Sequence, residues 1–302
     1  MTGIGMPRRT FLAGGLSLTA AAMAAEAPEK DGRGIRVRFL GTGVGLGGRR
    51  QSSVLLEGRV LIDLTPMSAQ GLPAGVRPEA IFYTHSHGDH YDPSAALRAG
   101  VRRVYAHASW AEGLRREFAM AAERLGAAMP AVKGLAFGER VAEGNMTFTA
   151  LPANHSTDRL TDGVAERTSM YLVEKGPSRL LYAVDTSGIP GDAARLIGID
   201  PHIPFGGTTA PHVHRGAAIT ALIMEATMGS GAEMDSDYRM FMHSSVDMVA
   251  RTARMLIAHK RLCPPQGQPV YLTHMAVGYD HVSGAIPAPL VPAQDGLEVC
   301  IG

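Results

Sequence analysis

Short apolar runs recur along the chain, and each stops abruptly at a polar residue or a glycine. Runs of about four to eight residues with alternating or continuous apolar positions are typical of β-strands. They occupy residues 35–40, 53–57, 59–63, 80–83, 146–151, 170–174, 179–185, 221–226, 269–274 and 297–301. The pattern predicts a framework of largely buried strands.

Two pairs of these runs predict hairpins that echo each other. Residues 53–57 and 59–63 flank a glycine turn, residues 170–174 and 179–185 form the second pair, and the pairs end in Asp63 and Asp185. This internal similarity indicates two related halves that face each other.

Two further segments have the spacing of amphipathic helices. The first runs from Ser109 to about Gly126; Ser109 and Glu112 predict a capping box at its start, with Leu114, Phe118 and Leu125 on the apolar face. The single tryptophan, Trp110, is expected in the core or as a surface anchor. The second helix begins at His243-Ser244-Ser245, and its apolar face comprises Val246, Val249, Ala253, Leu256 and Ile257.

The strongest chemical signal is Thr84-His85-Ser86-His87-Gly88-Asp89-His90, which follows the buried run 80–83. In an extended chain His85 and His87 point the same way and can bind one ion. Gly88 permits a tight turn that aims Asp89 and His90 at a neighbouring position. The stretch therefore predicts two adjacent metal sites.

Other strand ends supply matching residues. His155 and His274 each stand where a strand gives way to a loop, and Asp185 can bridge two cations through its two oxygens. Asp63 either orients the site from behind, together with Thr84, or is a turn residue. His202, His212 and His214 lie in a Gly- and Pro-rich loop and are expected to be solvated or substrate-facing, not ligands.

The N-terminus predicts export. Arg8-Arg9-Thr10-Phe11-Leu12 precedes a modest apolar segment, with Ala22-Met23-Ala24 as a cleavage site, so residues 1–27 resemble a twin-arginine signal peptide. We expect a periplasmic or secreted protein without a stable membrane anchor. Cleavage after residue 24 removes Arg8 and Arg9 and no acid, which takes the net charge from +1 to −1. This balance argues against a nucleic-acid polymer as partner.

Cys263 and Cys300 leave two alternatives open. They could form a disulfide in an oxidising periplasm, or they could be two buried free thiols.

His85, His87, Asp89, His90, His155, Asp185 and His274 together resemble the ligand set of the metallo-β-lactamase superfamily. The resemblance implies an α/β fold, a four-layer αβ/βα sandwich, in one domain covering residues 28–302. It also implies two divalent metal ions, zinc or manganese with iron as a third option. His85, His87 and His155 would hold one ion, Asp89, His90 and His274 the other, and Asp185 would bridge them.

Further motifs are similar to the phosphodiesterase branch that contains transfer-RNA 3′-processing nucleases and cyclic phosphate phosphodiesterases. They are a Glu-Ala-Thr strand end followed by His243-Ser244-Ser245, together with segments 151–156, 184–190, 271–274 and 295–299. A structural zinc site of the cyclic phosphate enzymes should be missing, because residues 43–49 lack its cysteines and Val277 replaces its histidine.

The resemblance implies hydrolysis of a small or cyclic phosphodiester by a metal-bridging hydroxide, with Asp89 and His243 as catalytic residues. His243 would stabilise the developing phosphorane or protonate the leaving group, although its place at a helix N-terminus disfavours imidazolium. A lactone or thioester hydrolase on the same metals and a non-catalytic metal-binding protein remain as alternatives. Whether the chain forms a homodimer is left open.

Overall fold

Two seven-stranded mixed sheets form the framework of the protein. The computed structural model describes residues 34–45, 48–200, 215–229, 242–276 and 286–302. The signal-peptide prediction for residues 1–27, the histidines His202, His212 and His214, and Val277 fall outside these ranges.

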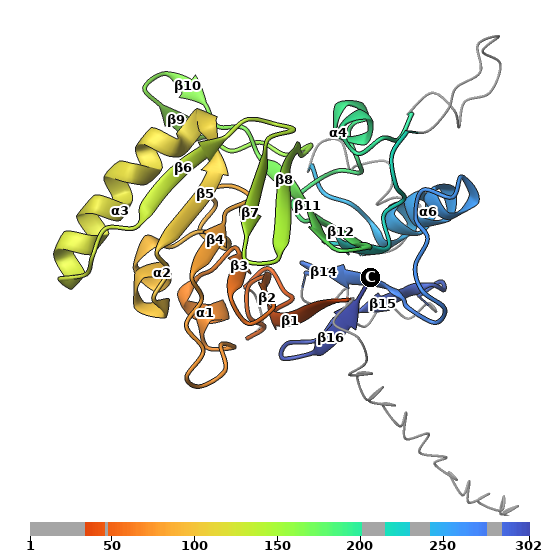
Figure 1. The fold of residues 1–302 in the computed structure, drawn as a ribbon, viewed down its shortest axis with the longest axis horizontal. Coiled ribbons are helices and arrows are strands. Elements are labelled where there is room, and N and C mark those ends of the chain that lie inside the picture. The colour runs from red at the N-terminus through yellow and green to blue at the C-terminus, as the bar shows by residue number, and fades with distance from the viewer. Residues whose placement is uncertain (1–33, 46–47, 201–214, 230–241, 277–285) are drawn as a thin grey trace, which may run out of the picture.

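The first sheet has the strand order β16-β1-β2-β3-β4-β5-β6 (Figure 1). Strands β1 to β3 and β16 pair antiparallel, whereas β3 to β6 pair in parallel. The strands are β1 (Ile35–Gly41), β2 (Ser53–Leu56), β3 (Val60–Ile62), β4 (Ala80–Phe82), β5 (Arg103–His107), β6 (Ala131–Leu135) and β16 (Glu298–Ile301).

The second sheet repeats this plan in the order β15-β14-β13-β12-β11-β8-β7. Strands β7, β8, β11 and β12 pair antiparallel, and β12 to β15 pair in parallel. The strands are β7 (Arg140–Glu143), β8 (Met146–Pro152), β11 (Ser169–Lys175), β12 (Ser178–Ala183), β13 (Ala221–Glu225), β14 (Val270–Thr273) and β15 (Leu290–Pro292). The two related halves expected from the sequence are thus present, and a small hairpin, β9 (Leu160–Thr161) and β10 (Val164–Ala165), lies outside both sheets.

The core has three parts that correspond to the layers. Between the sheets, aromatic side chains interdigitate, with the rings of Phe82 and Phe148 stacked 4.0 Å apart. A second apolar cluster packs the first sheet against its helices, and a third does the same for the other sheet. The helices are α1 (Pro66–Ala69), α2 (Pro93–Ala99), η1 (Ala108–Trp110) and α3 (Ala111–Leu125) on one side, and α4 (Gly191–Leu196) and α6 (Val246–Ala258) on the other. The predicted αβ/βα sandwich is confirmed (Figure 1).

Some local predictions are wrong in detail. The capping box at Ser109 does not form, because the Ser109 hydroxyl binds His107 and the amide of Arg167, while α3 begins two residues later without a side-chain cap. Trp110 is fully buried. Ile257 is 38% exposed and leaves the apolar face of α6 to Val246, Val249, Ala250, Ala253 and Leu256.

Neither alternative for the cysteines holds: Cys263 and Cys300 are unpaired, and both are exposed. Within the described ranges, no helix combines the length and apolar character needed to cross a bilayer.

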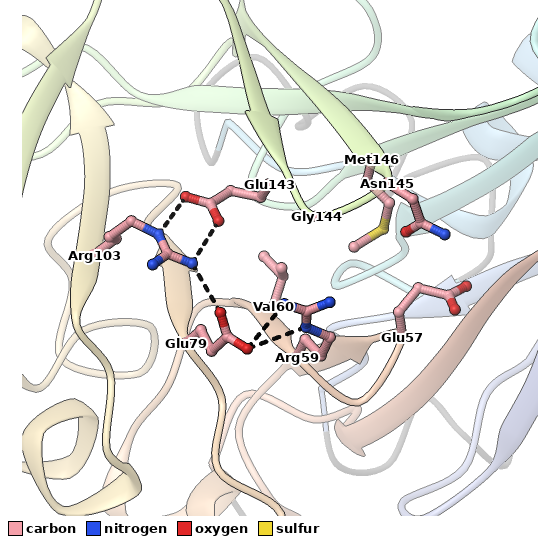
Figure 2. A pocket seen from close by; sticks show the side chains of 9 residues that line it. All are labelled: Glu57, Arg59, Val60, Glu79, Arg103, Glu143, Gly144, Asn145 and Met146. Carbon is pink, nitrogen blue, oxygen red and sulfur yellow. Dashed lines mark hydrogen bonds and ion pairs between the residues drawn. The ribbon is translucent and has the colours of Figure 1, made fainter.

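An ion-pair network closes the sheets at the amino ends of β3, β4 and β5 (Figure 2). Arg103 binds both oxygens of the buried Glu143 at 2.8 Å and also reaches Glu79, which in turn pairs with Arg59. The cavity among these residues measures about 10 Å³, room for about one water molecule. The ion pairs at this edge join the two sheets. The cavity among them is too small to hold a substrate.

Candidate metal centre

The histidines and carboxylates expected from the sequence converge at the carboxyl ends of strands from both sheets. The loop after β4 carries His85, His87, Asp89 and His90; His155, Asp185 and His274 follow β8, β12 and β14. The burial of these strands brings their polar ends to one edge, as in other α/β sheets whose sites lie beyond the strand carboxyl ends.

Three imidazoles form the first group. His85 Nε2 lies 3.0 Å from His87 Nδ1, and His155 Nε2 lies 3.2 Å from the same atom. Asp185 Oδ2 completes the group, 3.3 Å from His85 Nε2 and 3.5 Å from His155 Nε2. Three nitrogens and one carboxylate oxygen are a donor set suited to zinc or another divalent transition metal.

The second group adjoins the first. His90 Nε2 and His274 Nε2 lie 3.0 Å apart, and Asp89 Oδ2 is 3.2 Å from His274 Nε2. The other oxygen of Asp185, Oδ1, is 3.4 Å from His90 Nε2 and 3.2 Å from His274 Nε2. Asp185 therefore presents one oxygen to each group.

The hydrogen bonding of Asp185 Oδ1 tests whether this donor set fits a metal. The atom is fully buried and makes no hydrogen bond, although Nε2 of His90 and Nε2 of His274 lie within 3.4 Å of it. An orphaned buried carboxylate oxygen is costly unless a cation satisfies it. The residues present therefore fit a divalent ion at this position.

Four of the ligand histidines direct Nε2 toward the centre of their group. In each of them the other ring nitrogen, Nδ1, contacts a polar atom outside the group. Nδ1 of His90 lies 2.8 Å from Asp63 Oδ2, and Nδ1 of His85 lies 3.0 Å from the Thr84 hydroxyl, which itself donates to Asp63 Oδ2. Nδ1 of His274 is 2.8 Å from the Thr227 hydroxyl, and Nδ1 of His155 is 3.4 Å from the carbonyl of Met242. Such contacts fix the tautomer and aim Nε2 at a metal. The structure thus places Asp63 and Thr84 behind the site.

Backbone conformation marks the same positions. Asp63, Asp185 and His274 have φ values of 57°, 45° and 53°, in the left-handed region. Non-glycine residues adopt this region uncommonly, and such conformations concentrate at functional sites. At Asp185 and His274 the side chain reaches ligands of the other sheet, whereas Asp63 contacts Thr84 and His90 of its own sheet.

Burial and charge leave His85 and Asp185 in forms that bind metal. Burial lowers the pKa of the His85 imidazole to about 3, so this ring is neutral near pH 7. Burial alone would raise the pKa of Asp185, but His274, His90 and His85 outweigh it and hold that pKa well below its usual range. The carboxylate is therefore ionised.

His243 lies beside both groups. Its ring centroid is 5.0 Å from that of His155 and 5.6 Å from that of His274. His243 Nδ1 contacts both oxygens of the fully buried Glu225, at 3.1 and 3.2 Å. Burial opposes the charged form, but Glu225 overcomes it and raises the pKa of His243 to about 9. The expectation that the helix terminus disfavours imidazolium is therefore wrong, because it overlooked this carboxylate.

Sequence reasoning assigned no site role to three residues around the centre, two of which belong to the Glu-Ala-Thr strand end already recognised in the sequence. Glu225 ends β13, as Asp63 and Asp185 follow β3 and β12, so its strand-end position was a usable signal. Thr227 links Glu225 to His274 through its hydroxyl. Glu166 binds Ser86, between His85 and His87, and no local pattern announces a contact across 80 residues.

Comparisons with known proteins identify the family and the fold. The profile of the family described as "Beta-lactamase superfamily domain" matches residues 59–275. A search of curated protein sequences finds no match.

Three solved structures share the fold. The metallo-β-lactamase fold protein YhfI from Bacillus subtilis has 17% identity and a TM-score of 0.58, covering 88% of this chain and 99% of its own. A diphosphatase of the PhnP family has 20% identity and a TM-score of 0.55, covering 88% and 98%. Zn(2+)-bound PqqB from Methylobacterium extorquens has 16% identity and a TM-score of 0.59, covering 87% and 99%.

Proposed function

The chain belongs to the β-lactamase superfamily, and from that membership we propose that it is a dinuclear metal-dependent phosphodiesterase acting on a small or cyclic phosphodiester. Metal-dependent hydrolysis is the activity that the fold and the donor set support in common. Attack at phosphorus is the more specific part of the proposal.

The metal ligands would divide as their contacts divide. His85, His87 and His155 would hold one ion and Asp89, His90 and His274 the other, with one oxygen of Asp185 on each. Two divalent ions, when bound, lower the pKa of water toward about 7 and neutralise charge on a phosphoryl group.

The observation that carries the proposal is the placement of His243. Glu225 holds the Nδ1 edge of the ring, so Nε2 is the edge left for a substrate. The side chain is 18% exposed and lies against one histidine of each metal group. A donor there can hydrogen-bond an equatorial phosphoryl oxygen or pass its Nε2 proton to the departing alkoxide. The diphosphatase neighbour supports chemistry at phosphorus on this fold.

The leaving group provides the test. The zinc- or manganese-loaded enzyme should hydrolyse bis(p-nitrophenyl) phosphate and, better, cyclic phosphates. His243→Ala should lower kcat by about 10²- to 10⁴-fold with alkoxide leaving groups, and by less with p-nitrophenolate, which needs no proton. Metal content should not change.

A lactone and a thioester assayed beside the diesters address the alternative. Turnover of either one without diester activity would overturn the proposal and leave a carboxylic-ester hydrolase on the same centre. A His243→Ala protein that has lost metal would contradict the assigned role of His243.

We also propose export of the folded, metal-loaded protein through the twin-arginine route, on the strength of Arg8 and Arg9 in the sequence. Replacing both by lysine should retain the precursor in the cytoplasm. Equal amounts of cleaved protein outside the cytoplasm for both forms would refute it.

A further inference from the structure

Glu166 connects two loops that carry metal ligands. One of its oxygens accepts the backbone N–H of Ser86 at 2.8 Å, and the other accepts the Ser86 hydroxyl and, at 3.0 Å, the Thr157 hydroxyl. Ser86 separates His85 from His87, and Thr157 lies two residues beyond His155. The three histidines of the first group thus share one buried anchor, which is 7% exposed.

The segment around Glu166 is held at its base. The hydroxyl of Thr168 donates to the carbonyl of His155 at 3.0 Å, and the amide of Glu166 donates to the carbonyl of Arg159 at 3.1 Å. Between these contacts the chain forms the β9–β10 hairpin, which Arg116 and Asp162 tie to α3. Glu166 therefore stands on a braced support and not on a free loop.

The bonding of Glu166 is unusual for a purely structural acid. Among the residues that the structure describes, the donors to its side chain are all neutral, while the guanidinium of Arg159 pairs with Glu117. Burying a carboxylate without a direct ion pair is costly. The benefit is an acceptor that reaches the Ser86 amide and two hydroxyls at once.

We propose that Glu166 is a positioning residue for the ion held by His85, His87 and His155. By fixing Ser86 it sets the direction of the imidazoles on either side, and by fixing Thr157 it brings His155 to the same point. The inference rests on the metal centre of the proposed function, but not on phosphodiester chemistry.

The test measures metal affinity without substrate. Zinc is titrated into the metal-free full-length protein against a chromophoric chelator, and His87→Ala identifies which binding step belongs to the first group. Glu166→Ala should weaken that step by about 10- to 100-fold and leave the other step unchanged, as for other groups that orient metal ligands. The cobalt-loaded variant should show altered d–d bands.

Glu166→Gln serves as the conservative variant. Its amide oxygen still accepts the Ser86 amide, and the two hydroxyls can turn to accept its NH₂ group. It should recover most of the affinity. Ser86→Ala, which removes a single hydrogen bond, should cause a smaller loss at the same step.

Glu117→Ala is the matched control, because it loosens the same hairpin at Arg159 without touching Ser86. Equal losses in Glu117→Ala and Glu166→Ala would overturn the proposal, as would unchanged zinc affinity in Glu166→Ala. If Glu166→Ala does not fold, unchanged affinity in Ser86→Ala overturns it. A selective loss of affinity in a protein whose wild type is inert toward diesters would refute the proposed function and leave the role of Glu166 standing.

Discussion

Asp63 and Glu225 make similar contacts, one in each sheet. Each carboxylate contacts one histidine directly and a second through a threonine hydroxyl: Asp63 reaches His90, and His85 through Thr84. Glu225 reaches His243, and His274 through Thr227. One carboxylate thus orients two histidines in each sheet, from positions that do not correspond in the repeated hairpin plan.

Asp63→Asn should weaken zinc binding at both groups of ligands. Asn tolerates the left-handed backbone, but its NH₂ group cannot accept the two donors that meet at Oδ2. Because His85 belongs to one group and His90 to the other, we expect zinc affinity to fall by about 10- to 100-fold at each step. Chelator competition measures it.

Asp162→Asn is the control for that change, since Asp162 has a similar φ of 52° on the surface. A loss confined to one step in Asp63→Asn would contradict the shared role of Asp63.

His107, at the carboxyl end of β5, predicts a pH-dependent stability. Burial, and then the charge of Arg167, lower its folded-state pKa to about 4, against about 6.5 in an unfolded chain. As the pH falls, the unfolded state takes up the proton before the folded state does. The contribution of His107 to the free energy of unfolding is therefore fully present above about pH 6.5 and is lost as the pH drops toward 4.

His107 also caps η1 by accepting the amide of Ser109. His107→Asn keeps an acceptor at this N-cap but does not titrate. Between pH 7 and 5 the Tm of the wild type should therefore fall more than that of the variant. Parallel Tm profiles would show that His107 titrates alike in both states.

At the scale of elements, the ion pairs of Figure 2 join β5 of one sheet to β7 of the other. Arg103→Met would leave the buried Glu143 with the Tyr105 hydroxyl but without its cation. We expect a loss of about 1–3 kcal/mol in the free energy of unfolding, measured in urea. Zinc affinity should be unchanged, because the metal edge is at the opposite strand ends.

Arg115→Met provides the comparison, since its pair with Glu112 is about half exposed on both sides. Such surface pairs contribute about 0–1 kcal/mol. Equal losses in the free energy of unfolding for the two variants would mean that the buried pair of Arg103 and Glu143 stabilises the fold no more than an exposed pair does.

The elements also show what sequence can and cannot predict. Strand ends were predictable, because apolar runs stop sharply at His85, His155, Asp185 and His274. The start of α3 was not, because the Ser109 hydroxyl is captured by Arg167, 58 residues away. The role of Glu166 could not be predicted for the same reason. Its partners are set by the packing of two loops, and neither loop shows a periodic pattern.

At the scale of the whole molecule, the metal centre links the two sheets. Its first group takes His85 and His87 from one sheet and His155 and Asp185 from the other, and the second group takes ligands from both as well. An ion bound there stabilises only the state in which the sheets are packed together. Folding and metal binding should therefore be coupled.

Metal removal should accordingly lower the Tm. A ligand that binds only the folded state adds about 4.1 kcal/mol when its free concentration is 1,000 times its Kd. The Tm of the zinc protein should rise with buffered free zinc and fall to a plateau in excess chelator. Asp185→Asn, which removes the carboxylate charge shared by the two groups, should flatten this dependence, whereas Asp192→Asn on α4 should not. A Tm independent of free zinc would mean that the sheets pack equally well without the ions, and the centre would then serve chemistry alone.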